Sequence, residues 1–270
     1  MVDRRLSKLC IAISLALIVT SLTRGANAAA AEGFDVATTL LARTYTPGLS
    51  INPTVGYGHR VWGDIESPWY GFLRPHIDGV VSPSLYEGKA GIEFFPVSIL
   101  GVNLSRTFGR RFTDTRGQDC VANQCQGELD YTDLTVQAYF GAAGFFSSLR
   151  WTRTFFDAVS DQTRPIYDVG SSVLLKPAGE AGDYSTIVVG KDLSEDLAIG
   201  VLLQNADFHY SGQHQESQYL IARSNLKLFG FEDLSATLGL GRYKTDLNIA
   251  ELSGILSVTY TGQAAIGLGR

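Results

Sequence analysis

The sequence predicts an all-β protein, a single antiparallel transmembrane β-barrel of about 12 strands, or of 14, that follows a cleaved signal peptide. Short runs of alternating apolar and polar residues cover nearly the whole chain after residue 28, and no stretch there reaches the ~18 consecutive apolar residues of a membrane-spanning helix. Glycine, tyrosine and phenylalanine are abundant, with 29, 12 and 14 residues, which is typical of β-barrels.

The N-terminus carries the three parts of a secretory signal. Arg4, Arg5 and Lys8 precede an apolar run over 9–22, and the Ala-Asn-Ala of 26–28 supplies the small residues of a cleavage site. The apolar run is shorter than the ~20 residues that a transmembrane helix needs. We therefore expect a signal peptide at 1–28, and a barrel formed by 29–270.

The charge of the remaining chain excludes one class of partner. Cleavage after residue 28 removes four of the 22 basic and one of the 27 acidic residues, which leaves 18 and 26 and a net charge of −8. An acidic protein lacks the positive surface that nucleic acid requires, so we expect no nucleic-acid partner. The length fits one large barrel without a second domain.

Two cysteines, Cys120 and Cys125, remain after cleavage. Export places them in an oxidising compartment, which favours a disulfide within a polar loop. A metal site is the alternative, but the surrounding segment contains no histidine to complete a ligand set. We expect the disulfide and no metal.

Alternation predicts the individual strands, because successive side chains of a strand point to opposite faces. Leu134, Val136 and Phe140, for example, alternate with polar residues. Thirteen segments show this pattern: 36–45, 49–62, 67–80, 84–95, 98–110, 129–142, 145–157, 165–177, 184–191, 196–208, 217–229, 233–244 and 251–261.

Bacterial single-chain barrels have an even number of strands. Either 36–45, which also fits a short helix, lies outside a barrel of twelve strands, or 264–269 closes a barrel of fourteen. The connections alternate in length. Short turns are expected at 96–97, 141–144, 194–196 and 230–233, and longer polar loops at 110–128, 158–164 and 211–216.

The signal peptide, the alternating runs of about ten residues and the contrast between short turns and long loops resemble Gram-negative outer-membrane β-barrel proteins. The resemblance covers nearly the whole chain after residue 28 and rests on architecture, with no motif of a specific family. It implies residence in the outer membrane, with membrane lipid and the barrel-assembly machinery as partners. Such proteins usually end on an aromatic residue, whereas this chain ends on Arg270. A periplasmic or secreted β-protein is the alternative, since alternation describes any half-buried sheet.

Two further features favour the membrane. Charged residues make up only 18% of the chain, which is low for a solvated surface. Aromatic residues gather near the ends of the runs, where an interfacial girdle would lie. They are Trp62, Trp69, Tyr70, Phe94, Phe95, Phe145, Phe146, Phe155, Phe156, Phe208 and Tyr210.

If the apolar rows face lipid, the opposite rows line a lumen. Charges of both signs suit a water-filled channel for small polar or anionic solutes, or a packed polar network inside a closed barrel. A non-conducting surface barrel, serving in adhesion or in export or assembly of a surface polymer, is the alternative. The candidate lumen residues are Arg74, His76, Asp78, Lys89, Glu93, Asp133, Arg150, Asp168, Lys176, Arg223 and Lys227.

An enzymatic function has one short element in its favour. His209 and Ser211 resemble the His-x-Ser element of outer-membrane lipid A deacylases, which would imply hydrolysis of lipid acyl chains. No acidic residue has an assured place as the third member, because Arg223 stands twelve residues beyond Ser211. The sequence also lacks a phosphate-binding glycine loop and an HExxH motif. We therefore assign no catalytic residue and expect no cofactor.

Overall fold

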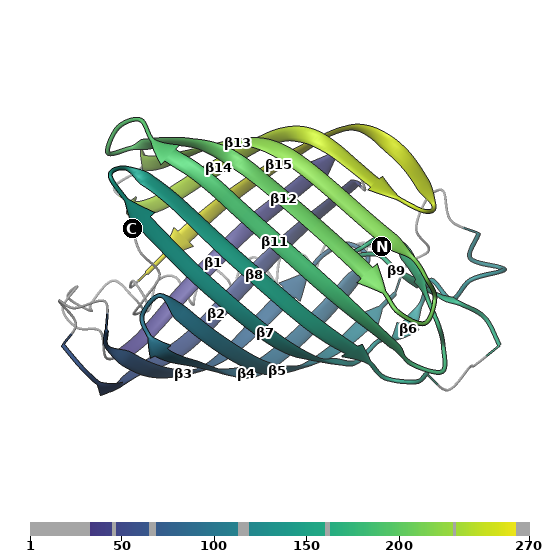
Figure 1. Cartoon of the computed structure of the whole chain (residues 1–270). Helices are drawn as coiled ribbons and strands as arrows, with labels where there is room; N and C mark the ends of the chain where they lie inside the picture. The colour runs from purple at the N-terminus through teal and green to yellow at the C-terminus, as the bar shows by residue number, and fades with distance from the viewer. Residues whose placement is uncertain are drawn as a thin grey trace, which may run out of the picture.

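The chain forms a closed antiparallel barrel. The computed structural model describes residues 33–44, 47–64, 69–112, 119–159, 163–228 and 231–262. Twelve strands pair in a ring, and Figure 1 shows them strongly tilted. They are β1 (Gly33–Thr44), β2 (Pro47–Trp62), β3 (Gly71–Val81), β4 (Leu85–Val97), β5 (Leu100–Arg111), β7 (Tyr131–Ala142), β8 (Phe145–Phe156), β11 (Glu180–Asp192), β12 (Leu197–Phe208), β13 (His214–Leu228), β14 (Phe231–Thr245) and β15 (Asn248–Thr261).

The first and last strands close the ring. β1 pairs with β15 from Ala37↔Thr261 to Arg43↔Ile255, so the described sheet has no open edge along this seam. The prediction of twelve strands is confirmed, but the reason given for that number is wrong. The segment 36–45 belongs to a barrel strand as far as Thr44, and 264–269 lies outside the described residues.

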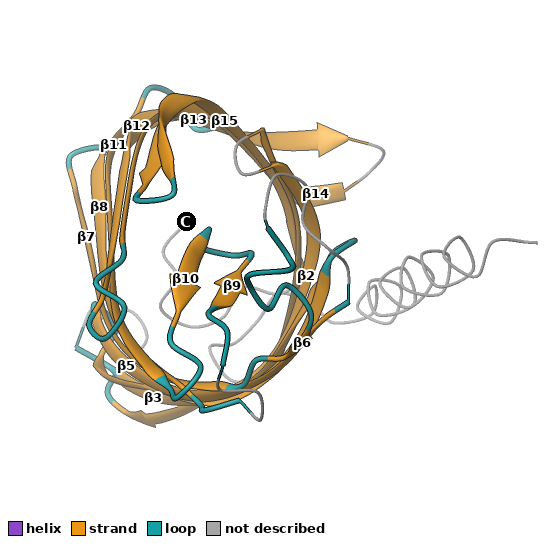
Figure 2. Ribbon diagram, turned by 90° about the vertical axis from the view of Figure 1, so that its right-hand side faces the viewer, coloured by secondary structure: helices purple, strands orange, loops and turns teal. Residues whose placement is uncertain are grey.

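The supernumerary candidate is 165–177, which is not a barrel strand. It forms β9 (Ile166–Asp168) and β10 (Val173–Leu175), a short hairpin that lies inside the ring (Figure 2). The turn between them starts at Asp168, whose carboxylate accepts hydrogen bonds from the backbone N–H groups of Gly170 and Ser171. A third short strand, β6 (Gly127–Glu128), pairs with the end of β5.

The two ends of the barrel differ in the length of their connections. The turns 98–99, 143–144 and 193–196 lie at the end where β1 begins and β15 finishes. The loops 112–130 and 157–179 lie at the opposite end, which we call the loop end. The predicted contrast between turns and loops is confirmed only for these connections, because 82–84 and 246–247 are short turns at the loop end. Of the turn expected at 230–233, residue 230 lies outside the described residues and 231–233 belong to β14.

Every barrel strand presents apolar side chains to the outside. On β12, Leu197 and Ile199 are 41% and 46% exposed, whereas Ala206, in the opposite row, is 1% exposed. A closed barrel with such an exterior is stable in lipid, where no unpaired backbone is tolerated. One exposed apolar residue from each strand is Leu40, Val55, Ile77, Ile92, Leu104, Val136, Leu149, Val189, Ile199, Leu220, Leu240 and Leu256.

Cations that lie over aromatic rings mark two levels on the outer wall. Lys191 Nζ lies 5.2 Å from the ring centre of Phe145, and the Arg153 guanidinium lies 5.7 Å from Trp151. Phe145 and Arg153 are eight residues apart on β8, which corresponds to about 20 Å of membrane depth for a strand tilted by ~40°. These levels fit the two borders of a hydrocarbon layer.

Neighbouring aromatic residues divide between the two faces. Phe94 and Phe155 are exposed outside, but their neighbours Phe95 and Phe156 are buried inside the barrel. The expectation that all of them form a girdle is therefore wrong for five residues, because adjacent side chains on a strand cannot share a face. The five are Tyr70, Phe95, Phe146, Phe156 and Phe208.

No helix among the described residues is both long and apolar enough to cross a membrane.

Candidate functional site

A buried ion-pair cluster lies on the inner wall of β1, β3 and β4. Arg74 Nε donates to Asp35 Oδ2 at 2.8 Å, Arg74 Nη2 donates to Asp35 Oδ1, and Arg74 Nη1 donates to Glu93 Oε2 at 2.9 Å. Gly56 makes this packing possible, since a Cβ built there would lie 2.5 Å from Arg74 Nε. One guanidinium thereby pairs with two carboxylates in the lumen and offsets one of their two negative charges.

A second polar group surrounds His76. Its Nδ1 lies 3.0 Å from Asp78 Oδ2, and its Nε2 lies 3.2 Å from Asn103 Oδ1. Gly91 on the neighbouring strand leaves the space that the imidazole fills, because a Cβ there would lie 2.6 Å from Nε2. The ring is held on both sides and buried.

A third group joins β4 to β7. Lys89 Nζ donates to Asp133 Oδ2 at 2.8 Å, and Thr154 Oγ1 donates to Asp133 Oδ1 at 2.6 Å. Glu87, from the same inward row as Lys89, accepts a hydrogen bond of 3.2 Å from the Tyr131 hydroxyl. Within the described wall, these carboxylates are thus satisfied by protein groups.

Two of the predicted lumen cations form no ion pair within the described residues. Arg150, in the inward row of β8, donates to Gln137 Oε1 at the long distance of 3.4 Å. Arg223 lies in the inward row of β13 and is exposed, with no ion pair in the described part of the chain. The lumen therefore combines acids that are paired with protein groups and cations that have no ion-pair partner among the described residues.

Three predicted residues stand elsewhere. Asp168 lies on the inner hairpin rather than on the wall, and Lys176 is exposed in the segment that follows β10. The side chain of Lys227 lies outside the described residues. Asp168 and Lys176 differ from expectation because their segment is a hairpin and not a barrel strand.

The hairpin is fastened to opposite sides of the ring. Arg111 Nη1, from β5, donates to the carbonyl oxygens of Tyr167 at 2.8 Å and Gln124 at 2.7 Å. The Tyr243 hydroxyl, from β14, donates to the Ser171 carbonyl at 2.7 Å. These contacts place the hairpin across the lumen near the loop end.

Apolar packing holds the hairpin against a third part of the wall. Val173 and Leu175 of the hairpin are fully buried in a cluster with Phe156 of β8 and Phe208 of β12. A second apolar cluster, Tyr70, Phe72 and Phe95, lies at the opposite end, where the rings of Phe72 and Phe95 stack at 4.4 Å. The charged groups lie between the two clusters, so the inner wall is less uniformly polar than the sequence suggests.

Among the residues of this site that sequence reasoning missed are Asp35, Arg111 and Tyr243. Asp35 and Arg111 stand one residue beyond the predicted ends of their strands, 36–45 and 98–110. Tyr243 lies in the inward row of a predicted strand, but no sequence signal connects it with a hairpin more than 70 residues away. Extending the alternation by one residue at each boundary would have found the first two.

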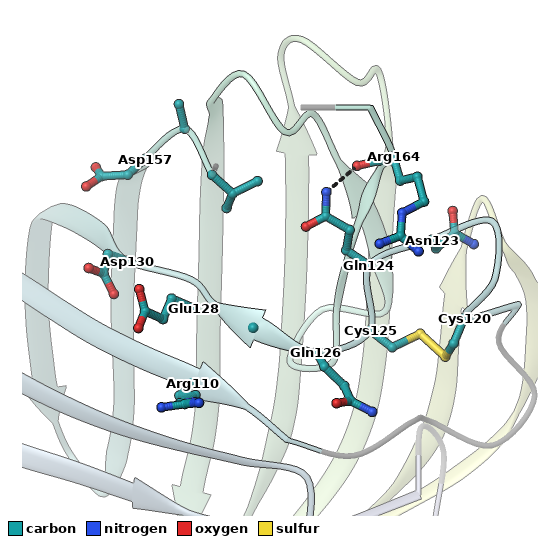
Figure 3. Close-up of a pocket in the computed structure, with 13 residues that line it drawn as sticks. Arg110, Cys120, Asn123, Gln124, Cys125, Gln126, Glu128, Asp130, Asp157 and Arg164 are labelled. Atoms are coloured by element: carbon teal, nitrogen blue, oxygen red, sulfur yellow. Dashed lines mark hydrogen bonds between the residues drawn. A yellow bond between two sulfur atoms is a disulfide. The ribbon is translucent and has the colours of Figure 1, made fainter. Parts of the chain in front are cut away.

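A cavity of 630 Å³ opens at the loop end between the loop 119–130 and the residues 157–159 and Arg164 (Figure 3). The Cys120–Cys125 disulfide, which confirms the predicted pairing, lies on its border. Arg106, on the outer wall, hydrogen-bonds the Asp157 carboxylate and holds the pKa of that acid below its usual value. The lining is polar and of mixed charge.

His209 and Ser211 lie in the turn after β12 and engage different partners. His209 Nε2 lies 2.7 Å from Asp183 Oδ2. The backbone N–H groups of Tyr210 and Ser211 each donate a hydrogen bond to the Glu180 carboxylate, so both oxygens of this acid are hydrogen-bonded to the backbone. Nowhere in the described ranges do three or more His, Cys, Asp or Glu residues gather as a metal site.

No family model matches the chain, and neither does any curated protein. Solved structures do. An outer membrane channel from Pseudomonas putida F1 is 10% identical, with a TM-score of 0.47, 87% of this chain covered and 97% of that chain. The KdgM porin is 8% identical, with a TM-score of 0.43 and coverages of 84% and 98%.

The β domain of the Bordetella autotransporter BrkA is 10% identical, with a TM-score of 0.41 and coverages of 85% and 99%. Similarities of this size assign no function. The closed ring of twelve antiparallel strands, with apolar side chains outside and charges inside, makes the chain a β-barrel protein of the outer-membrane type.

Proposed function

We propose that the protein is a narrow outer-membrane channel for small polar solutes, with a preference for anions. The observation that carries the proposal is the hairpin β9–β10, which narrows a charged lumen from within. The diameter of a barrel grows with its strand number, so twelve strands enclose a lumen of fixed width. The hairpin occupies part of this lumen and therefore lowers the maximum size of the solutes that can pass.

Charge supports the anion preference. Arg74 and Lys89 pair with Asp35, Glu93 and Asp133 and offset two of their three negative charges, which weakens the attraction of these acids for cations. Arg150 and Arg223 carry charge without an ion-pair partner among the described residues, and an anion passing along the wall meets that charge in a medium less polar than water.

A non-conducting surface barrel is the second candidate, and one observation favours it. The hairpin contacts the wall through β5, β8, β12 and β14, and its apolar side chains are fully buried. Such contacts suit a permanent closure, which would leave the loop end as a surface for adhesion or for handling a polymer.

Permeation into proteoliposomes separates the two candidates. Purified protein in phospholipid vesicles should admit small organic anions faster than neutral solutes of equal size, and it should exclude oligosaccharides. Heat-treated protein in the same vesicles is the control. Vesicles that stay as tight as protein-free ones would overturn the channel and favour the closed surface barrel.

A further inference from the structure

The hairpin inside the barrel is hydrogen-bonded to the disulfide loop at the barrel rim. Gln124 N–H donates to the Pro165 carbonyl at 2.8 Å, and Tyr167 N–H donates to the Gln124 carbonyl at 3.1 Å. Gln124 and Ile166 form a parallel bridge, so the loop adds an edge to β9. Gln124 directly precedes Cys125, which the disulfide joins to Cys120. The disulfide therefore fixes the backbone that carries the hairpin.

Arg111, on the barrel wall, also binds both the loop and the hairpin. We call the contacts among Arg111, Gln124 and 165–167 the plug joint. The Arg111 guanidinium donates to the carbonyl of Gln124 in the loop, to the carbonyl of Tyr167 in β9 and, at 3.4 Å, to the carbonyl of Gln126. The side chain is buried, and no carboxylate within the described residues forms an ion pair with it. The two terminal nitrogens of this buried guanidinium donate to three carbonyls of the loop and hairpin, while its Nε has no hydrogen-bond partner among the described residues.

We infer that the loop 119–130 and the hairpin 166–175 form a releasable plug, which Arg111 and the Cys120–Cys125 disulfide hold in the lumen. Release follows from reduction. An external dithiol transfers two electrons and two protons to the disulfide, which yields two cysteine thiols and the cyclic disulfide of the reagent. Cys120 is only partly buried at the rim, so a dithiol approaching from the loop end reaches it.

Reduction loosens the joint for a conformational reason. The closed loop of six residues limits the backbone freedom of Gln124, and opening it raises the entropy that the two hydrogen bonds to Pro165 and Tyr167 must overcome. Val173 and Leu175 contact the wall independently of the disulfide, so reduction raises the frequency with which the hairpin opens and leaves the barrel strands folded. The conductance readout below rests on the proposed channel function, whereas the exchange readout does not.

Hydrogen exchange of the full-length protein in detergent or lipid tests the joint itself. With a dithiol present, amide exchange in peptides covering 163–175 should rise by about tenfold, while peptides from β12 and β13 stay unchanged. The double variant Cys120→Ser/Cys125→Ser should exchange quickly with or without the dithiol. Arg111→Gln should show the same loosening, and Arg110→Gln, a neighbour that does not touch the hairpin, is the matched control.

Planar-bilayer recording tests the consequence. The time spent in the larger conducting state should rise in the presence of the dithiol, and the Cys120→Ser/Cys125→Ser variant should show that state without it. Unchanged exchange over 163–175 in both reduced protein and Arg111→Gln would overturn the plug joint. Faster exchange without any current would support the joint and overturn the channel function instead.

Discussion

Tyr243 and Ser171 join the barrel wall to its interior. The hydroxyl of Tyr243, on β14, donates a hydrogen bond of 2.7 Å to the backbone carbonyl of Ser171 in the turn of the inner hairpin. The phenol is almost fully buried, so water does not replace this bond. A hairpin that is attached here and at Arg111, on β5, spans the lumen.

Loss of this bond should loosen the hairpin more than the barrel. Tyr243→Phe leaves the Ser171 carbonyl without its donor and should lower the free energy of unfolding by about 1–2 kcal/mol. Amide exchange in the hairpin should increase, while the barrel strands keep their protection. Tyr57→Phe, on the exposed outer wall, is the control and should change the free energy of unfolding by less than about 0.5 kcal/mol. Equal effects of the two variants would contradict the assignment.

The ion-pair cluster around Arg74 depends on an empty space at Gly56. A methyl group at residue 56 would overlap the guanidinium, because its carbon would lie 2.5 Å from Arg74 Nε. Gly56→Ala should therefore displace Arg74 from Asp35 and Glu93. Overpacking and a weakened buried pair together should cost about 2–4 kcal/mol in denaturant unfolding. Gly88→Ala is matched to it, because no atom lies within 4 Å of a Cβ there. A cost no larger than that of Gly88→Ala would show that Arg74 is free to move.

Ion selectivity should depend on the two unpaired cations of the lumen. The double variant Arg150→Gln/Arg223→Gln should lower the permeability ratio of chloride to potassium about threefold or more, since it removes two charges from the wall. The reversal potential across a potassium chloride gradient measures this ratio. Arg153→Gln makes the same change on β8 but on the outer wall, where Arg153 pairs with Asp183, and should leave the reversal potential unchanged. A shift in the Arg153 variant alone would exclude the proposed path.

The destabilisation caused by a charged residue on the outer wall should depend on its depth in the membrane. Leu220 is 71% exposed near the middle of β13, and Leu220→Arg should destabilise the barrel in vesicles by about 2–4 kcal/mol. Gln218 is exposed two residues nearer to the loop end, and Gln218→Arg should cost about 0–1 kcal/mol. Guanidinium unfolding of the vesicle-inserted protein compares them. Equal tolerance of both substitutions would indicate an outer wall in contact with water.

Alternation was sufficient to predict the barrel but not its contents. The rows of β7 and β12 show the period of two that a wall between lipid and lumen imposes. The sequence alone therefore predicts which of their side chains face lipid and which face the lumen. The segment 165–177 shows the same period because a hairpin packed inside also buries one side, with Tyr167, Val173 and Leu175 fully covered. The turn at Asp168, Gly170 and Ser171 was the available sign that the segment reverses after three residues.

The candidate site was predictable where a residue's role follows from its row. Arg74, His76, Asp78, Lys89, Glu93 and Asp133 stand in rows that the structure turns inward, but their pairing depends on which strands become neighbours. Arg74 meets Asp35 from a strand that is not adjacent to β3, across Gly56. Contacts of this kind depend on ring closure and on the absence of a side chain, and local sequence records neither.

Single-channel conductance of the purified protein in planar bilayers tests the central claim most directly. The wild-type barrel should give a small, stable current. A variant in which a short glycine–serine linker replaces residues 166–175 should give a current several times larger, because the segment that narrows the lumen is absent. Heat-modifiable migration on a gel establishes that both proteins are folded. Currents of equal size from the two folded proteins, or no current from either, would contradict a channel narrowed by its own hairpin.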